Sequence, residues 1–470
     1  MLFGIVYALL SVGNHLCFRT YGLDLGLYTH TLYDYAHLRA ADTSFFLWSS
    51  SNLLSDHFDL LLMLLSPLVY LLGGYTLIVV QIVAVLAGGL GVYRLAREYG
   101  IEEWPLTLLM ALLLLQFGVW HALGFDYHSN VVCAMALPWM LLMLKRHRWG
   151  WATALLVFLL IGKETMSLWV TAVLVALMWD YRHDRAALRW LTFGTLVTLA
   201  YFALVALLIM PAIGENSGRG FWRYEWMGTN VGEVACWVLT HPLEAVRDIF
   251  VDFTPEGGHG GEKVEFFVCT LLCGGALLFV KPNYLLMLVP PVVMKMLSAD
   301  TGFWGLTYHY NAEVAVVLTV GTVAVLAGWE KGKAQRWTST IVSGLALITL
   351  IYSVSNPESP IRKENLRLYD SRHYHQTDFD ADAARRMIGK IPDGASVCAT
   401  TMFTPHVALR DSVYIFPMGL AYGADYWLLL EHSGLYYEGE EETVQKMIGD
   451  TAHYRIIDTD GSLYLLQHIR

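Results

Sequence analysis

Long apolar stretches separated by short polar turns run through most of the chain, from Met1 to about Ser355. Many of them approach the ~20 residues that a helix needs to cross ~30 Å of hydrocarbon. We therefore expect a membrane all-α region with about eleven transmembrane helices, over 2–18, 76–95, 105–120, 130–144, 150–162, 166–180, 190–212, 264–280, 283–297, 312–329 and 338–355.

Two places interrupt this series of apolar stretches. Residues 58–72 are short and lie between Asp56-His57 and Gly73-Gly74, so they either follow the membrane interface or dip in and return. The ionisable pair Lys163-Glu164, after Gly162, divides 150–180 into two short helices. The first stretch, Leu2 to Cys17, lacks the charged start and cleavage site of a signal peptide, so we interpret it as a retained first helix.

Lysine and arginine gather in alternate short turns between the predicted helices. Cytoplasmic loops carry an excess of these residues. We therefore predict a protein of the plasma (inner) membrane with its N-terminus on the cytoplasmic side. The outer face then holds loops 19–75 and 213–263. The basic turns contain Arg94 and Arg97; Lys145, Arg146 and Arg148; Arg182, Arg185 and Arg189; Lys281; and Lys331, Lys333 and Arg336.

The sequence changes character after Ser355, where charged residues and short alternating apolar runs replace the long apolar stretches. We predict a domain division into a polytopic region, 1–355, and a soluble extracytoplasmic α/β domain, 356–470. Its expected helices are 380–389 and 440–448, and its expected strands are 396–400, 413–416, 426–430, 455–458 and 463–467.

The composition agrees with a membrane protein and excludes some partners. The chain is 56% hydrophobic and 15% charged, against about 45–50% and 25% in soluble domains. A net charge of −10 argues against a nucleic-acid partner, which requires a basic surface. Cys269 and Cys273 are one helical turn apart but lack a histidine or carboxylate at ligand spacing. The sequence requires no cofactor, and a divalent metal is not indicated.

Ionisable residues collect on the predicted outer face, where they are candidates for chemistry or polar-ligand binding. Asp24 is suited to act as a general base that accepts a proton from an acceptor hydroxyl. The alternative is that it caps the N-terminus of a helix beginning at Leu25. Asp56 and His57 suit a ligand site, or again a helix cap at the interface. The candidates are Asp24, Asp56, His57, Asp126, His128, Lys163, Glu164 and His309.

Lys163 and Glu164 lie at membrane depth, where an ionisable group costs ~2.5–3.5 kcal/mol and usually faces a cavity or a partner. Lys163 is suited to bind a lipid phosphate through its positive charge. The alternative is that Lys163 and Glu164 only pair with each other. Asp126 and His128 share a short loop that fits ligand binding or a hydrogen-bond relay, and His309 lies between two tyrosines.

The order of these features resembles the GT-C superfamily of integral-membrane glycosyltransferases: a first helix, a long outer loop with an early Asp, many further spans and an outer α/β domain. The chain is also similar to an uncharacterised family of polytopic membrane proteins, a domain of unknown function. The matching stretches are Leu23-Asp24-Leu25-Gly26, Asp56-His57-Phe58, Lys163-Glu164, Tyr308-His309-Tyr310, Pro405-His406 and Val413-Tyr414-Ile415-Phe416-Pro417.

The resemblance implies an inverting glycosyltransferase that moves a sugar from a polyprenyl-phosphate donor in the bilayer to a glycan, lipid or protein acceptor. It assigns the catalytic role to Asp24, with Asp56 second. The residues themselves suggest that the remaining six candidates bind substrate. Asp24 is followed by Leu25, whereas many GT-C enzymes have paired acids there, so the base and any metal remain open. The alternatives are a carrier or flippase, which usually has an internal repeat, or a scaffold for lipid-linked saccharides.

Overall fold

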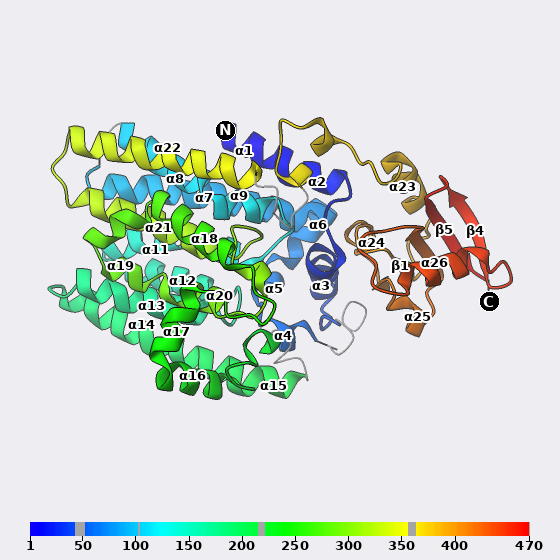
Figure 1. Cartoon of the computed structure of the whole chain (residues 1–470), viewed down its shortest axis with the longest axis horizontal. Coiled ribbons are helices and arrows are strands. Elements are labelled where there is room, and N and C mark those ends of the chain that lie inside the picture. Colours follow the sequence, from blue (N-terminus) through cyan, green and yellow to red (C-terminus); the bar gives the residue numbers. More distant parts are fainter. Residues whose placement is uncertain (43–51, 102–103, 215–220, 356–362, 470) are drawn as a thin grey trace.

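The computed structural model describes residues 1–42, 52–101, 104–214, 221–355 and 363–469, and most of them are helical. Long, roughly parallel helices form one body, and a small sheet domain lies beyond one end of it (Figure 1). The division predicted at 355/356 falls at the edge of a segment outside the described residues.

The N-terminal quarter of the helical body consists of short helical pieces followed by one long helix, α7. The expected first span is a continuous helical segment with a π-helical turn in its middle. The apolar stretch 58–72 is helical and joins α7, with a bend at Gly73, which has a φ of +55°. The pieces are α1 (Leu2–Tyr7), η1 (Ala8–Val12), α2 (Gly13–Leu16), η2 (Gly22–Gly26), α3 (Leu27–Ala36), α4 (Leu53–Asp56), α5 (Leu61–Leu65), η3 (Ser66–Leu68), α6 (Val69–Leu72), η4 (Gly73–Tyr75) and α7 (Thr76–Glu98).

The middle of the chain contains the break predicted at Lys163-Glu164, because α12 ends at Leu160 and α13 begins at Met166. A second break at Gln116 bends α8 and α9 by 49°. The elements are α8 (Trp104–Leu115), α9 (Phe117–Leu123), α10 (Ser129–Ala134), α11 (Leu137–Lys145), α12 (Trp149–Leu160), α13 (Met166–Asp180), α14 (Arg185–Leu204), η5 (Val205–Ile209) and α15 (Met210–Ile213).

The region 213–263, expected as a long loop, contains two helices, α16 and α17. Pro242 begins α17, where its missing N–H costs nothing. The remaining elements of the body are η6 (Phe221–Tyr224), α16 (Val231–Thr240), α17 (Pro242–Phe250), α18 (Gly260–Leu272), η7 (Gly275–Val280), α19 (Asn283–Leu286), α20 (Val289–Met296), η8 (Thr301–Phe303), α21 (Ala312–Ala327) and α22 (Lys333–Ser355).

Within the described part of the chain, three helical segments are long and apolar enough to cross a membrane: Leu61–Glu98, Arg185–Ile213 and Lys333–Ser355. The bent pair α8–α9 makes a fourth if it is one span. Shorter apolar helices lie in several of the other expected spans: Leu2–Leu16, Ser129–Lys145, Trp149–Leu160, Met166–Asp180 and Ala312–Ala327. A further one, Val231–Thr240, lies in the expected loop 213–263. The count of eleven crossings therefore stays a prediction.

The C-terminal region contains a five-stranded mixed sheet in the order β2-β1-β3-β5-β4. β1 pairs in parallel with β2 and β3, whereas β5 is antiparallel to β3 and β4. All five strands were predicted within two residues. The elements are η9 (Lys363–Asn365), η10 (Ser371–Tyr374), α23 (Ala381–Ile388), β1 (Val397–Ala399), α24 (Thr404–Val407), β2 (Val413–Ile415), α25 (Gly419–Tyr422), β3 (Tyr426–Leu430), α26 (Glu440–Gly449), β4 (Tyr454–Thr459) and β5 (Leu463–His468).

The segment that leads into the sheet domain is tied to the first helix. Asn14 donates its side-chain amide to the backbone oxygen of Asn365 at 2.9 Å. Arg19 donates to the backbone oxygens of His373, at 3.2 Å, and His375, at 2.5 Å. Because Asn14 and Arg19 are buried, these bonds satisfy polar groups that would otherwise be costly.

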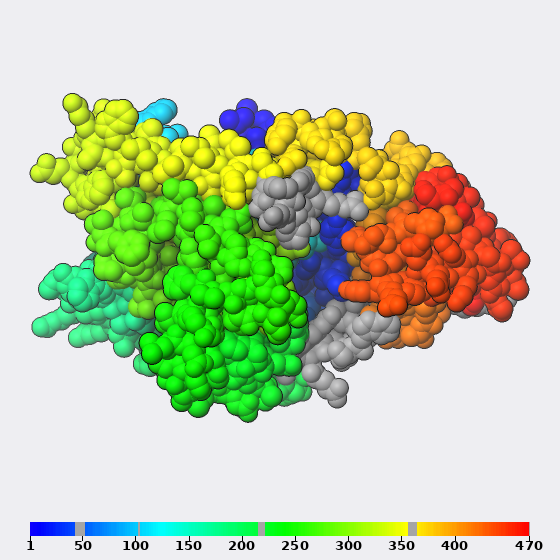
Figure 2. Space-filling view, viewed as in Figure 1, coloured from blue at the N-terminus to red at the C-terminus, as the bar shows by residue number. Residues whose placement is uncertain are grey.

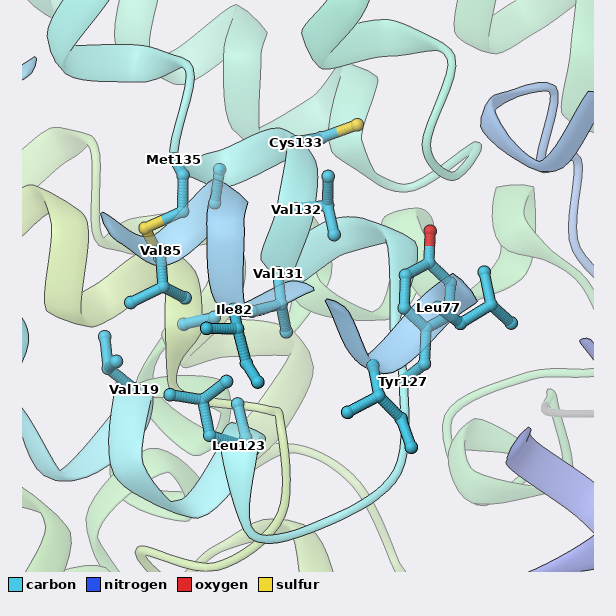
Figure 3. Packing of buried hydrophobic residues seen from close by; sticks show 14 of the residues in the cluster. Leu77, Ile82, Val85, Val119, Leu123, Tyr127, Val131, Val132, Cys133 and Met135 are labelled. Carbon is cyan, nitrogen blue, oxygen red and sulfur yellow. The ribbon is translucent and has the colours of Figure 1, made fainter. Parts of the chain in front are cut away.

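Buried apolar side chains pack α7, α9 and α10 against one another. Figure 3 shows Ile82 and Val85 of α7 beside Val119 and Leu123 of α9, with Val131 of α10 near them. All five side chains are buried. This packing supports the loop between α9 and α10, which carries two of the sequence candidates.

Gly118 in α9 marks a close approach to the loop before α21. A Cβ built on Gly118 would lie 2.3 Å from the backbone oxygen of Asn311. We expect Gly118→Ala to lower the free energy of unfolding by about 1–3 kcal/mol, because backbone rather than a flexible side chain must move. Thermal unfolding in detergent measures this. Gly344→Ala is the control, since its Cβ would meet nothing within 4 Å, and equal effects of the two changes would contradict the packing argument.

Candidate functional site

Asp24 lies on a tight turn, η2, that is fixed from two sides. The Asp126 carboxylate accepts the backbone N–H groups of Tyr21, at 3.1 Å, and Leu25, at 3.4 Å. On the other side, Gly22 N–H donates to the Thr401 hydroxyl at 3.0 Å. The Asp24 side chain caps no helix, so the N-cap interpretation is wrong, and it remains 31% exposed.

Asp126 is itself held by a glutamine from the second turn of α7. Gln81 donates to the Asp126 backbone oxygen at 2.9 Å and accepts the His128 N–H at 2.9 Å. This clamp accommodates a φ of +40° at Asp126, a strained value for a residue with a Cβ. The Asp126 carboxylate therefore supports the turn that carries Asp24.

His128 joins Asp24 to a third loop. Its Nε2 lies 3.4 Å from Asp24 Oδ1, and its ring stacks on His309 with 3.3 Å between centroids and an interplanar angle of 17°. The Phe125 ring also stacks with His128, with 5.5 Å between the ring centroids. Burial lowers the pKa of both His128 and His309, so the stacked rings are neutral near pH 7.

The break between α12 and α13 meets the segment that contains His57. Glu164 Oε1 lies 3.6 Å from His57 Nδ1, and Glu164 Oε2 accepts the Phe58 N–H at 3.1 Å. The interpretation of Lys163 and Glu164 as a self-satisfied pair is therefore wrong. Lys163 is half-buried, and its ammonium group makes no hydrogen bond or ion pair with any residue that the structure describes.

Electrostatic effects connect these groups, which come from segments far apart in the sequence. The positive charge of Lys163 and the neighbouring His57 add to burial in lowering the pKa of His128 and His309. The negative charge of Asp24 adds to burial in raising the pKa of Asp126. Asp24, His57, Lys163, His128 and His309 thus form one cluster, which we call the polar cluster.

Two neighbouring aspartates differ in role. Asp59 accepts the N–H of Leu61 at 3.0 Å and the hydroxyl of Ser129, so it supports the start of α5, and burial raises its pKa to about 7. Asp56 is half-buried at the end of α4 and has no hydrogen-bond or ion-pair partner among the described residues. Asp56 therefore remains available to a ligand, whereas Asp59 does not.

Two buried residues beside this region, Glu313 and Gln81, were not among the candidates predicted from the sequence. Glu313, in the first turn of α21, accepts the side-chain amide of Asn130 at 2.8 Å. Both side chains are 9% exposed. A glutamate at the start of an apolar span was the signal that could have found it. Gln81 carried a weaker signal, as a single polar residue within an apolar helix.

Metal ligands do not converge in the described ranges: no three His, Cys, Asp or Glu side chains are placed to hold an ion. Cys269 and Cys273 are free and buried in or just after α18. The chemistry that the polar cluster supports is that of a carboxylate, a lysine, the neutral imidazoles of His128 and His309, and the imidazole of His57. Figure 2 shows a recess between the green part of the helical body and the orange sheet domain, with N-terminal residues in blue inside it.

A helical body, a C-terminal sheet domain and a polar cluster near their junction define a polytopic membrane protein with an ArnT-like fold. The chain belongs to the family described as predicted membrane protein (DUF2079), whose model matches residues 14–450. The structure of ArnT from Cupriavidus metallidurans bound to undecaprenyl phosphate is similar, with a TM-score of 0.50 and 13% identity over 100% of this chain and 97% of that chain. No curated protein matched the sequence. The resemblance inferred from the sequence is confirmed at the level of family and fold.

The stacked histidines predict a pH dependence of stability. The unfolded chain binds protons below about pH 6.5, the ordinary pKa of histidine, while folded His309 does not until a lower pH. The unfolded state therefore holds more protons in that window, and stability falls as the pH drops. We expect His309→Phe, which keeps a ring in the stack, to show a shallower fall in Tm below pH 6.5 than wild type. Equal slopes would contradict this.

Proposed function

We propose that the protein is a membrane glycosyltransferase that moves a sugar from a polyprenyl-phosphate donor to an acceptor hydroxyl, with the polar cluster as its active site. The observation that carries the proposal is that two ionisable side chains, Asp24 and Lys163, both act on His128. Asp24 Oδ1 lies 3.4 Å from His128 Nε2, and the charge of Lys163 adds to burial in lowering the pKa of His128. The Lys163 ammonium group has no hydrogen bond or ion pair with a described residue. The ArnT neighbour, bound to undecaprenyl phosphate, supports the lipid class.

Asp24 is the proposed general base. Its carboxylate takes the proton of the acceptor hydroxyl, whose oxygen forms a bond to the anomeric carbon. The bond from that carbon to the phosphate oxygen breaks, and its electron pair leaves with the polyprenyl phosphate. An in-line displacement of this kind inverts the anomeric configuration. Because burial keeps His128 neutral, it forms no full ion pair that would occupy the Asp24 carboxylate.

Lys163 is the proposed holder of the lipid phosphate. A fixed ammonium group stabilises the negative charge that develops on the leaving phosphate, and burial strengthens the interaction. The next residue, Glu164, positions His57, because Glu164 Oε1 lies 3.6 Å from His57 Nδ1. His57 and Asp56 are placed to bind the remaining polar groups of the donor, and His309 forms a wall of the cluster through its stack on His128.

We place the polar cluster and the C-terminal domain, 356–470, on the extracytoplasmic side, with the N-terminus in the cytoplasm and about eleven crossings. The basic short turns support this orientation. The sheet domain contacts the Asp24 turn through Thr401, and a Cβ on Gly22 would lie 2.8 Å from Ile415 Cδ1. A domain in this position is suited to select or hold the acceptor.

The function is tested with purified wild type reconstituted in liposomes that contain a polyprenyl-phosphate sugar labelled in the sugar. A crude envelope extract supplies the acceptor. We expect the label to move to the acceptor while free polyprenyl phosphate accumulates. A carrier or flippase would instead move the intact donor between leaflets, and this outcome would replace the proposal.

A further inference from the structure

A groove lies at the end of the helical body that is far from the sheet domain. It consists of two adjoining cavities of about 560 and 340 Å³, which share Met143 and Trp151 in their walls. Glu98, Arg146 and Arg148 line the larger cavity, and Trp139 lines the smaller one. The groove is separate from the polar cluster, because none of its residues belongs to that cluster.

The length of α7 shows how far the groove lies from the sheet domain. A Cβ on Gly74, just before α7, would lie 4.0 Å from Pro405 of the sheet domain. α7 then runs for 23 residues to Glu98, roughly 34 Å at 1.5 Å per residue. Glu98 therefore lies one membrane thickness away from the junction with the sheet domain.

The apolar part of the groove is built by close packing of α11 on α7. A Cβ on Gly91 would lie 2.7 Å from Trp139 Nε1, so only glycine lets the indole lie against α7. Trp139 also donates to the Ala87 backbone oxygen at 2.9 Å. Its ring is therefore fixed as one wall, and the exposed Trp151 of α12 forms another part of the groove.

The charged part of the groove carries a net positive charge. Arg146 donates to Glu98 Oε2 from Nε, at 2.8 Å, and from Nη2, at 2.6 Å, which leaves its Nη1 group available. Arg148 is exposed, and its guanidinium group has no hydrogen bond or ion pair with the described residues. Two guanidinium groups face a single carboxylate, so the rim can accept an anion.

A charged rim that continues into an aromatic and aliphatic wall matches an amphiphile with an anionic head. We propose that this groove binds an anionic glycerophospholipid, with its phosphate at Arg146 and Arg148 and an acyl chain along Trp139 and Trp151. Basic pockets between transmembrane helices on the cytoplasmic side commonly take such headgroups. A free phosphate would use the charged cavity alone and leave the apolar one empty.

The test compares the full-length protein in detergent with added phosphatidylglycerol or phosphatidylcholine, read by native mass spectrometry and by the shift in Tm. We expect wild type to bind phosphatidylglycerol preferentially and to be stabilised by it. The double variant Arg146→Gln/Arg148→Gln should bind it roughly thirtyfold more weakly. Arg185→Gln/Arg189→Gln removes two charges from the same end of the body and should behave as wild type.

Three results would overturn the proposal: equal binding of the two lipids, an equal loss in both double variants, or a Tm shift of the same size from inorganic phosphate. Similar Tm values of the variants and wild type in phosphatidylcholine show that the variants are folded. Trp151→Ala provides a second measurement, because it leaves the charges in place. It should weaken lipid binding without creating any response to inorganic phosphate.

Discussion

Asp24→Asn is expected to lower the rate of sugar transfer about 10²–10⁴-fold, the usual contribution of a positioned general base. The carboxamide keeps the shape of the side chain but does not accept the proton of the acceptor hydroxyl. The turn that carries residue 24 should remain intact, because its bonds run through Asp126, Gly22 and Thr401 rather than through the Asp24 side chain. Donor affinity should therefore change little, and release of polyprenyl phosphate measures the rate.

Asp393→Asn is the matched control for this change, since Asp393 is exposed in the C-terminal domain. It should leave both rate and donor affinity unchanged. Asp56→Asn separates the two candidate bases. If Asp56→Asn abolished transfer and Asp24→Asn did not, the base would be Asp56.

Lys163→Met is expected to weaken binding of polyprenyl phosphate about 10–100-fold. A hydrogen bond to a charged group contributes roughly 1.5–3 kcal/mol, and each 1.4 kcal/mol corresponds to tenfold in affinity. The Lys163 ammonium group has no hydrogen bond or ion pair with a described residue, so its removal breaks no direct contact. The change should therefore act on the ligand rather than on the fold. Isothermal titration or native mass spectrometry measures the affinity.

Lys163→Arg keeps the positive charge and should retain most of the affinity. The comparison separates charge from shape, because a structural role of the lysine stem would be disturbed by both substitutions. Unchanged affinity in Lys163→Met would place the phosphate elsewhere.

The C-terminal sheet was predictable because its signals are local. Short runs rich in β-branched and aromatic residues, such as Val413–Ile415 and Tyr426–Leu430, end at turn residues, and the observed strands have nearly the same bounds. The break at Lys163-Glu164 was predictable for a different reason. Ionisable residues within an apolar run are costly unless a partner or cavity receives them, and Glu164 meets His57.

The partners within the polar cluster were not predictable, because they come from segments far apart in the sequence. Nothing near Asp126 indicates that its carboxylate binds the backbone of residues 21 and 25, and Gln81 gives no local sign of its contacts with Asp126 and His128. The stack of His128 on His309 likewise depends on tertiary packing. Sequence periodicity describes single elements and does not specify such long-range pairs.

Helices within the expected outer loops were missed for a related reason. α16 and α17 are each ten residues or fewer, below the length at which a periodic pattern is distinctive. Proline and asparagine at their starts were the available signals, since Asn230 caps α16 by accepting the Glu233 N–H at 3.0 Å.

The most direct measurement is a cryo-electron microscopy structure of the wild-type protein in nanodiscs with bound polyprenyl phosphate. We predict phosphate density in contact with Lys163, close to His57 and on the same side of the stacked histidines as Asp24. Phosphate density only in the groove at Arg146 and Arg148, or at any position remote from Lys163, would contradict the assignment of the polar cluster as the active site.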